Sequence, residues 1–200
     1  MLQRALNKLP ITSITPFTFQ DYPEHTACIL WFSGCNMACS YCHNPELVKG
    51  ELAKLPPAQV IEFLESRKDL LEGVVLSGGE CMMSAQLPDF ARYLKSLGFK
   101  VKVDTNGTNP DMLEKMLGEQ LIDYVALDYK APPDLFQSIT GFDGYALFER
   151  SLKLLIVSGI PLEIRTTVHA DLLDEEDINS ILKHLENLGF NGTYYVQHFI

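Results

Sequence analysis

A regular alternation of short apolar runs with helix-like segments is the feature that most constrains the fold of this chain of 200 residues. Six runs rich in β-branched residues predict strands at 27–32, 74–77, 100–104, 124–128, 162–168 and 193–196. Apolar residues at helical spacing predict helices at 57–67, 87–97, 111–120, 144–158 and 174–188. This alternation favours parallel βαβ units, and six of them are too few to close an eight-stranded barrel. The sequence therefore predicts an α/β fold, an open partial (β/α)6 barrel.

Composition and charge restrict the class of protein. Apolar residues make up 46% of the chain and charged residues 21%, which is typical of one globular domain, and no interior linker divides residues 1–200. The net charge of −10 and the lack of a basic, aromatic-rich run argue against a nucleic-acid partner. The N-terminus lacks the apolar segment of a signal peptide, and no run of about 18 apolar residues could span a membrane. We therefore expect a cytoplasmic protein without a membrane partner.

Three of the five cysteines, Cys35, Cys39 and Cys42, lie close together in the spacing C-x3-C-x2-C. Crowding of this kind indicates a metal centre rather than a set of disulfides. Cysteine thiolate is the usual ligand of iron–sulfur clusters, and three thiolates on one loop can bind three irons of a [4Fe-4S] cluster. Cys28 and Cys81 lie outside this loop, so the fourth iron would remain open, as catalytic metal sites do. The loop therefore predicts a catalytic cluster.

Three other interpretations of the same cysteines stay open. Residues 39–43 satisfy C-x-x-C-H, the pattern for covalent c-type haem, although such haems are normally attached after export and Cys35 would be left unexplained. A structural zinc site could use the three cysteines and His43, although the adjacency of Cys42 and His43 strains ligation of one tetrahedral ion. The third interpretation is a set of buried cysteines without a ligand. A zinc-stabilised binding module is thus the non-catalytic alternative.

Polar and glycine residues follow the predicted strands at the end where ligands bind in parallel α/β sheets. They are residues 35–44 after the first strand, Gly78, Gly79 and Glu80 after the second, Asp104 after the third, and Asp128 and Lys130 after the fourth. Two neighbouring acids, Asp104 and Asp128, would repel each other unless a cation or a charged ligand neutralises them. As alternatives, the Gly-Gly-Glu run could be an ordinary turn, and Asp104 could cap the turn through Asn106 and Gly107.

Arg165 lies in the predicted strand 162–168, which should otherwise be buried. A buried guanidinium needs an anionic partner. A ligand carboxylate and an acid of the barrel both meet this requirement, so a binding role and a structural ion pair remain open.

These motifs together resemble the radical S-adenosylmethionine (SAM) superfamily. The cysteines match its C-x3-C-x-aromatic-C pattern, with Tyr41 as the aromatic residue. Residues 78–81 match its Gly-Gly-Glu-Pro motif except that Cys81 replaces proline, which we expect to be neutral, with a supplementary redox role as the alternative. Within the superfamily, the segments 21–23, 42–48, 104–107, 123–132 and 163–168 are similar to the activating proteins of anaerobic ribonucleoside-triphosphate reductase, a glycyl radical enzyme.

The resemblance implies that residues 1–200 are a single radical SAM domain and that the protein is an oxidoreductase, a glycyl-radical-enzyme activating enzyme. Such an enzyme binds SAM at the open iron, and one electron splits SAM into methionine and a 5′-deoxyadenosyl radical. That radical takes a hydrogen atom from a glycine of the partner, here the anaerobic ribonucleotide reductase, with a flavodoxin- or ferredoxin-type electron donor. The alternatives are a pyruvate formate-lyase activating enzyme and a small-molecule enzyme such as 7-carboxy-7-deazaguanine synthase.

The resemblance also implies roles for individual residues, and no catalytic side chain is expected beyond the three cysteines that hold the cluster. The SAM-binding residues that it implies are Tyr41, His43, Gly78, Gly79, Glu80, Asp104, Asp128, Lys130 and Arg165. Among them, the Gly-Gly-Glu motif would hold the methionyl ammonium group, and Lys130 would lie near the SAM carboxylate. Asp104 and Asp128 would form a monovalent-cation site beside SAM.

Overall fold

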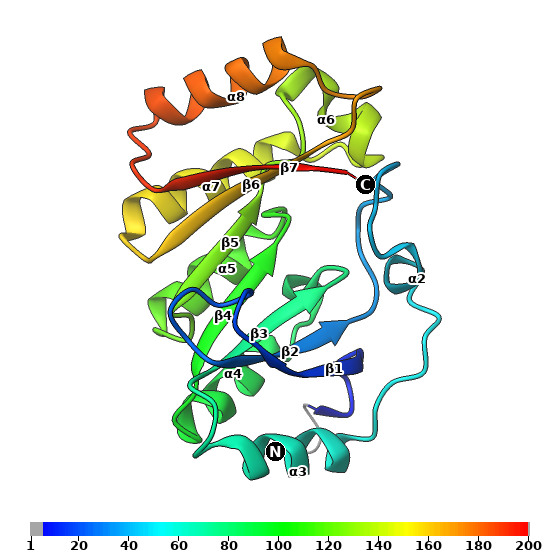
Figure 1. Ribbon diagram of the computed structural model, residues 1–200, viewed down its shortest axis with the longest axis vertical. Helices are drawn as coiled ribbons and strands as arrows, with labels where there is room; N and C mark the ends of the chain where they lie inside the picture. Colours follow the sequence, from blue (N-terminus) through cyan, green and yellow to red (C-terminus); the bar gives the residue numbers. More distant parts are fainter. Residues whose placement is uncertain (1–5, 200) are drawn as a thin grey trace.

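A seven-stranded sheet forms the centre of the protein in the computed structural model, which describes residues 6–199 (Figure 1). Its strands, in chain order and in spatial order, are β1 (Ile11–Thr18), β2 (Ala27–Phe32), β3 (Gly73–Gly78), β4 (Lys100–Thr105), β5 (Tyr124–Asp128), β6 (Leu162–Val168) and β7 (Thr193–His198). β1 runs antiparallel to β2, and β2 to β7 are all parallel. β1 and β7 stay at opposite edges of the sheet. The six parallel strands therefore confirm the predicted open partial (β/α)6 barrel.

Helices connect the parallel strands as the sequence predicts. They are α2 (Pro45–Val48), α3 (Pro57–Arg67), the 3-10 turn η1 (Cys81–Met83), α4 (Leu87–Ser96), α5 (Pro110–Gly118), α6 (Pro133–Thr140), α7 (Tyr145–Ser158) and α8 (Glu175–Asn187). The predictions for α3, α4, α5, α7 and α8 are confirmed, with ends within two residues of those expected. Periodicity does not predict α2 and α6, because these helices have only 4 and 8 residues and therefore little helical repeat in their sequences.

The sequence pattern does not predict the strand β1 either, and the reason is a proline within it. Pro16 interrupts it, and proline is confined to edge strands and irregular positions because it has no N–H to donate. β1 is indeed an edge strand, and its register with β2 shifts between Thr15 and Thr18, around this proline. The irregular segment hides the alternation that would predict a strand.

Each face of the sheet carries an apolar cluster, and the two clusters differ in size and position. On the outer face, Val101, Val103, Leu127 and Ile164 pack with helix residues such as Phe148 in the main core. On the inner face, a smaller apolar cluster fills the region near the amino ends of the strands; it contains Tyr22, Ala27, Ile29 and Val75 with Trp31 and Tyr124. This arrangement leaves the inner face at the carboxyl ends of the strands to polar residues.

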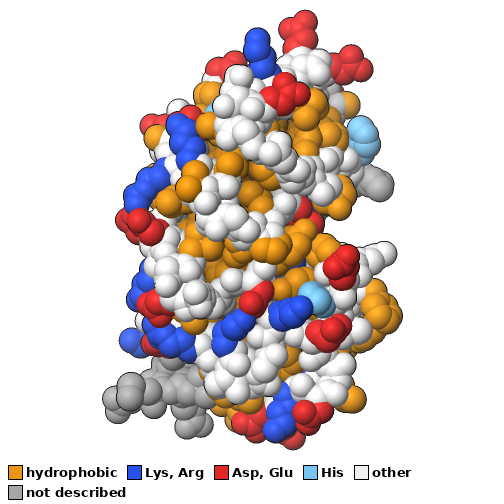
Figure 2. All heavy atoms as spheres, turned by 90° about the vertical axis from the view of Figure 1, so that its left-hand side faces the viewer, with side chains coloured by type: hydrophobic (Ala, Val, Ile, Leu, Met, Phe, Trp, Pro, Cys, Tyr) orange, Lys and Arg blue, Asp and Glu red, His pale blue; other side chains and the backbone are white. Residues whose placement is uncertain are grey.

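The surface on the side that is at the left of Figure 1 carries basic and acidic side chains interspersed with apolar ones, as Figure 2 shows. A few large apolar side chains, such as Phe19 and Val157, are exposed, which is normal for a protein surface. Among residues 6–199, no helix is both long enough and apolar enough to cross a bilayer.

Candidate active site at the carboxyl ends of the strands

The carboxyl ends of the strands and the cysteine loop, residues 33–44, line a common pocket. The predicted site residues found in its wall are Cys35, Cys39, Tyr41, Cys42, His43, Gly78, Gly79, Asp104, Asp128, Lys130 and Arg165. Glu80 is the exception, since it is buried behind this wall. Residues that are far apart in the sequence thus meet where parallel sheets bind ligands. Their individual roles remain predictions.

Backbone hydrogen bonds hold the cysteine loop in place. The N–H of Gly34 donates to the carbonyl of Leu47 in α2 at 2.6 Å, and the N–H of Ala38 donates to the carbonyl of Thr140 in α6 at 2.8 Å. The hydroxyl of Tyr41 donates to the carbonyl of Lys130 at 3.1 Å. The two short helices that the sequence analysis missed therefore position the loop.

Gly78 and Gly79 allow the end of β3 to approach the cysteine loop closely. A Cβ atom on Gly78 would lie 2.3 Å from the carbonyl oxygen of Phe32, and one on Gly79 would lie 2.1 Å from that of Gly34. Gly78 also has a φ of 121°, a conformation that favours glycine. The requirement for two successive glycines is therefore steric, because a larger residue would collide with the end of β2 at position 78 and with the cysteine loop at position 79.

The three loop cysteines are free thiols that face this pocket. Burial raises the pKa of the Cys35 thiol to about 11 and also raises the pKa of Cys39. Thiols in such surroundings become thiolates when a bound metal centre supplies positive charge. Within residues 6–199, no three His, Cys, Asp or Glu side chains converge as one metal ion would require. A cluster binds each cysteine through a different iron, so this donor set fits a [4Fe-4S] cluster.

Glu80 links two loops of the pocket from behind. Its Oε1 accepts hydrogen bonds from the Met82 N–H and the Thr105 hydroxyl, both at 2.9 Å, and its Oε2 accepts one from the Asn106 N–H at 2.7 Å. Burial raises the pKa of this carboxyl to about 7, although these hydrogen bonds oppose the shift. The carboxyl group thus organises the pocket wall, and its contact with the methionyl ammonium stays a prediction.

Asn106 is a site residue that the sequence analysis did not single out. Its side-chain amide donates to Asn36 Oδ1 at 3.0 Å and lies 3.8 Å from the sulfur of Cys35. Hydrogen bonds to cysteine sulfurs tune the potential of iron–sulfur clusters. The available signal was its place in Asp-Thr-Asn-Gly, directly after a predicted strand.

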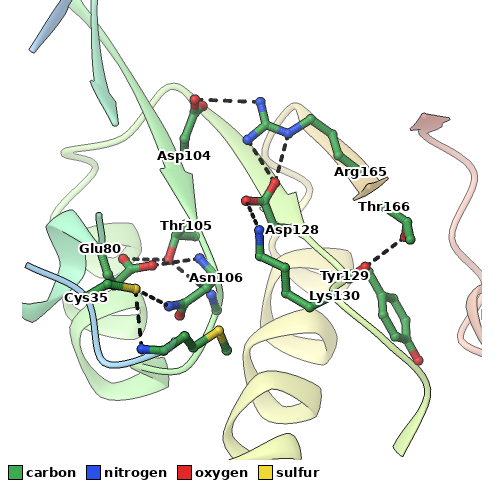
Figure 3. A network of polar contacts seen from close by, with 12 residues as sticks. Cys35, Glu80, Asp104, Thr105, Asn106, Asp128, Tyr129, Lys130, Arg165 and Thr166 are labelled. Carbon is green, nitrogen blue, oxygen red and sulfur yellow. Dashed lines mark hydrogen bonds and ion pairs between the residues drawn. The ribbon is translucent and has the colours of Figure 1, made fainter. Parts of the chain in front are cut away.

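Asp128 is the centre of a charged network at the end of β5 (Figure 3). Its Oδ1 accepts a hydrogen bond from Arg165 Nε at 3.0 Å, and its Oδ2 accepts one from Lys130 Nζ at 2.9 Å. Burial alone would raise the pKa of Asp128, but the two cations outweigh burial and lower it to about 2. Asp128 likewise raises the pKa of Lys130 and of Arg165 against the opposing effect of burial. Arg165 therefore forms a structural ion pair and also lines the pocket, so its two interpretations are compatible.

Asp104 points toward the same network and does not cap the turn that follows it. Its Oδ2 accepts a hydrogen bond from the Ser77 hydroxyl at 3.0 Å and lies 3.6 Å from Arg165 Nη1. Thr105 closes the turn instead, because its hydroxyl oxygen accepts a hydrogen bond from the Gly107 N–H at 3.1 Å. The capping alternative for Asp104 is therefore wrong, because its carboxylate faces the barrel interior.

Lys102 and Glu163 are two further charged residues that the sequence analysis did not assign to the site. Both are buried on the inner face, and Lys102 Nζ lies 3.1 Å from Glu163 Oε1 and 3.1 Å from Asp104 Oδ1. In the sequence, the position of Lys102 between Val101 and Val103 indicates its place on the inner face, because side chains alternate between the two faces of a strand.

Cys81 is buried outside the pocket wall, at the start of η1. Its thiol lies 3.6 Å from the carbonyl oxygen of Leu76 and 3.7 Å from that of Asp104. A small, buried thiol with carbonyl partners supports the expectation that Cys81 is a neutral substitution.

Comparison with known families places residues 29–188 in the radical SAM superfamily, and this span contains every predicted site residue. A protein of Methanocaldococcus jannaschii, provisionally named a glycyl-radical enzyme activating enzyme, is 32% identical over 96% of this chain and 80% of its own length. The pyruvate formate-lyase-activating enzyme of Clostridium pasteurianum is 30% identical over 80% of this chain and 71% of its own. The 7-carboxy-7-deazaguanine synthase of Methanopyrus kandleri is 32% identical over 82% of this chain and 69% of its own length.

Solved structures show the same fold at low sequence identity. The structure of native anSMEcpe with bound AdoMet aligns with a TM-score of 0.67 and 17% identity, over 84% of this chain and 49% of that one. Streptococcus suis SuiB bound to precursor peptide SuiA aligns with a TM-score of 0.67 and 17% identity, over 86% of this chain and 38% of the SuiB chain. The chain thus spans about half or less of the length of these structures. The family match and the relatives together show that the chain belongs to the radical SAM superfamily and is related to its glycyl-radical-enzyme activating members.

Proposed function

We propose that this protein cleaves SAM reductively at a [4Fe-4S] cluster and generates a glycyl radical on anaerobic ribonucleoside-triphosphate reductase. The observation that carries the proposal is the meeting of the cysteine loop, the two glycines of the Gly-Gly-Glu motif and a charged network in one pocket. Similarity to an activating enzyme over nearly the whole chain supports a glycyl radical enzyme as the partner. The choice of the reductase rests on the segments 104–107, 123–132 and 163–168, which supply Asp104, Asp128, Lys130 and Arg165 to this pocket.

The residues of the pocket would bind and orient SAM. Lys130 and Arg165 offer cations to the carboxylate of SAM, and the backbone at Gly78 and Gly79 can approach its methionyl part because neither residue has a side chain. When bound, the cluster, held by Cys35, Cys39 and Cys42, would supply one electron to divide SAM into methionine and a 5′-deoxyadenosyl radical. Transfer of a hydrogen atom from the glycine Cα would then release 5′-deoxyadenosine and leave the unpaired electron on the partner.

The open sheet supports a protein substrate over a small molecule. The edge strands β1 and β7 do not pair with each other, so the barrel is open along one side. A loop of the partner could enter there and bring its glycine next to the SAM carbon, whereas small substrates favour enclosed pockets. We further propose that residues 1–200 act as a single domain with a flavodoxin- or ferredoxin-type electron donor.

The test is anaerobic incubation of the reduced enzyme with SAM and the reductase, followed by electron paramagnetic resonance (EPR). We expect a doublet from a glycyl radical, and its splitting should collapse when glycine in the partner is α-deuterated. Little 5′-deoxyadenosine should form without the partner. A reductase in which the radical glycine is replaced by alanine is the matched control and should give no signal.

Two alternative outcomes would redirect the proposal. A signal from pyruvate formate-lyase and none from the reductase would favour the activity in the name of the Clostridium pasteurianum relative. Turnover of a small substrate without a protein partner would favour an enzyme of the 7-carboxy-7-deazaguanine synthase type, in line with the Methanopyrus kandleri relative. Silence from both glycyl radical enzymes would overturn the activase proposal.

A further inference from the structure

Lys102 is a lysine buried inside the barrel, directly beneath the wall of the SAM pocket. It projects from the inner face of β4, and only 2% of its side chain is exposed. Its ammonium lies between two carboxylates, 3.1 Å from Asp104 Oδ1 and 3.1 Å from Glu163 Oε1. A buried ammonium is costly unless it is paired, so this placement indicates a specific electrostatic task.

The neighbouring strand provides the space for this ammonium. Ala126 on β5 is paired in register with Asp104 on one side and with Glu163 on the other. The methyl group of Ala126 is too small to fill the inner face between Asp104 and Glu163. The side chain of Lys102 extends into this space from two residues before Asp104, where its backbone is in register with Tyr124. The ring of Tyr124 lies beneath, with its centre 5.5 Å from Lys102 Nζ, and its hydroxyl donates to Glu163 Oε2 at 3.1 Å. The ammonium is thus held by neighbours on three strands.

The six charged side chains of this network balance one another without an added ion. Lys102, Lys130 and Arg165 face the carboxylates of Asp104, Asp128 and Glu163. Each oxygen of the two acids that were predicted to bind a monovalent cation already has a side-chain cation nearby. The contacts are Lys102 at 3.1 Å and Arg165 at 3.6 Å for Asp104, and Arg165 and Lys130, both at 2.9 Å, for Asp128. A further cation would be repelled by these three groups, so the site does not fit one.

We propose that the ammonium of Lys102 acts as a built-in monovalent cation and positioning residue, which holds Asp104 at the pocket wall so that SAM binds without K⁺ or Na⁺. Asp104 Oδ1 has no aligned hydrogen bond within the described part of the chain, so Lys102 acts on it as a charge. Lys102 does not line the pocket wall. It acts on the pocket by positioning Asp104 directly and by positioning Arg165 through their shared partner Glu163. The inference rests on SAM binding in this pocket and is independent of the protein partner.

The test measures SAM binding by calorimetry to the unreduced, cluster-containing enzyme in KCl, NaCl or tetramethylammonium chloride at equal ionic strength. We expect the wild-type dissociation constant to agree within about twofold in the three salts, since such a difference is below the usual range of ligand coupling. Lys102→Met should bind SAM about tenfold more weakly in tetramethylammonium, and K⁺ or Na⁺ should recover at least about fivefold. The melting temperature of Lys102→Met, without SAM, should likewise rise in K⁺ or Na⁺ only.

Two controls separate this role from general damage. Lys102→Met combined with Asp104→Asn removes both the ammonium and the carboxylate that it neutralises, so its SAM binding should be independent of the cation. Lys100→Met removes a lysine from the exposed end of the same strand and should behave as the wild type does.

Wild-type binding that requires K⁺ or Na⁺ would overturn the proposal, as would a Lys102→Met variant that responds to no salt. If Lys102→Met does not fold, the comparison of wild-type SAM binding in KCl, NaCl and tetramethylammonium chloride tests the proposal by itself. Failure to form a glycyl radical would leave these results unaffected, because none of the readouts uses the partner.

Discussion

The inner and outer faces of β4, β5 and β6 are formed by alternating residues of the same strands and perform different tasks. On the outer face, Val103, Leu127 and Ile164 are completely buried against the helices. On the inner face, next to them in sequence, Asp104 and Asp128 carry charges toward the pocket. Hydrophobic burial on one face stabilises the sheet enough for the other face to hold charges that are expensive to bury. Stability and chemistry are therefore separated by the alternation of side chains along each strand.

Replacing cysteines on the two sides of this division should give the largest difference. Cys35→Ala, Cys39→Ala or Cys42→Ala should each abolish SAM cleavage, because each removes one of the three proposed cluster ligands from a loop without a spare cysteine. Iron content, and 5′-deoxyadenosine production under dithionite with the partner enzyme present, measure the effect. Cys28, buried in the main core, is the matched control, and Cys28→Ala should keep both the cluster and the cleavage. A loop variant with an intact cluster and full production would show that the ligand assignment is wrong.

A second pair of substitutions compares charge on the inner face with volume on the outer face. Arg165→Met should destabilise the protein by about 3 kcal/mol, because Asp104, Asp128 and Glu163 each lose one of their two cationic partners, and it should weaken SAM binding at least about tenfold. Val103→Ala should cost about 2 kcal/mol by removing buried apolar volume and should leave SAM binding unchanged. Urea unfolding and calorimetry measure the two quantities. Equal losses of SAM affinity in both variants would break the proposed separation of the two faces.

The pH dependence of stability tests whether burial keeps Glu80, behind the pocket wall, in its protonated form. Its folded pKa of about 7 is above its ordinary value of 4.5, so the folded state favours the protonated acid. This contribution is fully present below about pH 4.5 and is lost as the pH rises through about 7, by an amount on the order of 3 kcal/mol. Glu80→Gln should remove that slope. Unfolding in urea at pH 5 and pH 8 measures it on the metal-free protein, and identical slopes for both proteins would contradict the burial argument.

The smallest effect is expected in the helical shell, far from the pocket. Asp174 caps α8, and its carboxylate accepts hydrogen bonds from the N–H groups of Glu176 at 2.8 Å and Asp177 at 3.0 Å. Asp174→Ala should therefore cost about 1 kcal/mol. Chemical unfolding should detect this loss while SAM affinity stays the same, and Asp171→Ala, at an exposed position just before the cap, serves as the control. A parallel loss of SAM affinity would show that the shell and the pocket are coupled.

The sequence by itself determined the features that local patterns encode. Periodicity located the six parallel strands and five of the helices, and the order of strands and helices predicted an open barrel. The spacing of three cysteines on one loop and the glycines after β3 indicated the chemistry before any contact was known. The rule that ligands meet the carboxyl ends of parallel strands then brought Asp104, Asp128 and Lys130 to the same site.

Only the tertiary structure decided how the charges are shared. Lys102 and Glu163 are 61 positions apart in the numbering, and they meet because Ala126 leaves space between their strands. The sequence also placed Glu80 in the pocket, whereas the fold puts its carboxyl behind the wall, where backbone N–H groups reach it. Such pairings depend on distances between strands and on the burial of each group, and burial sets the energy of a charge. Local periodicity contains neither quantity, so they emerge only when the strands are assembled.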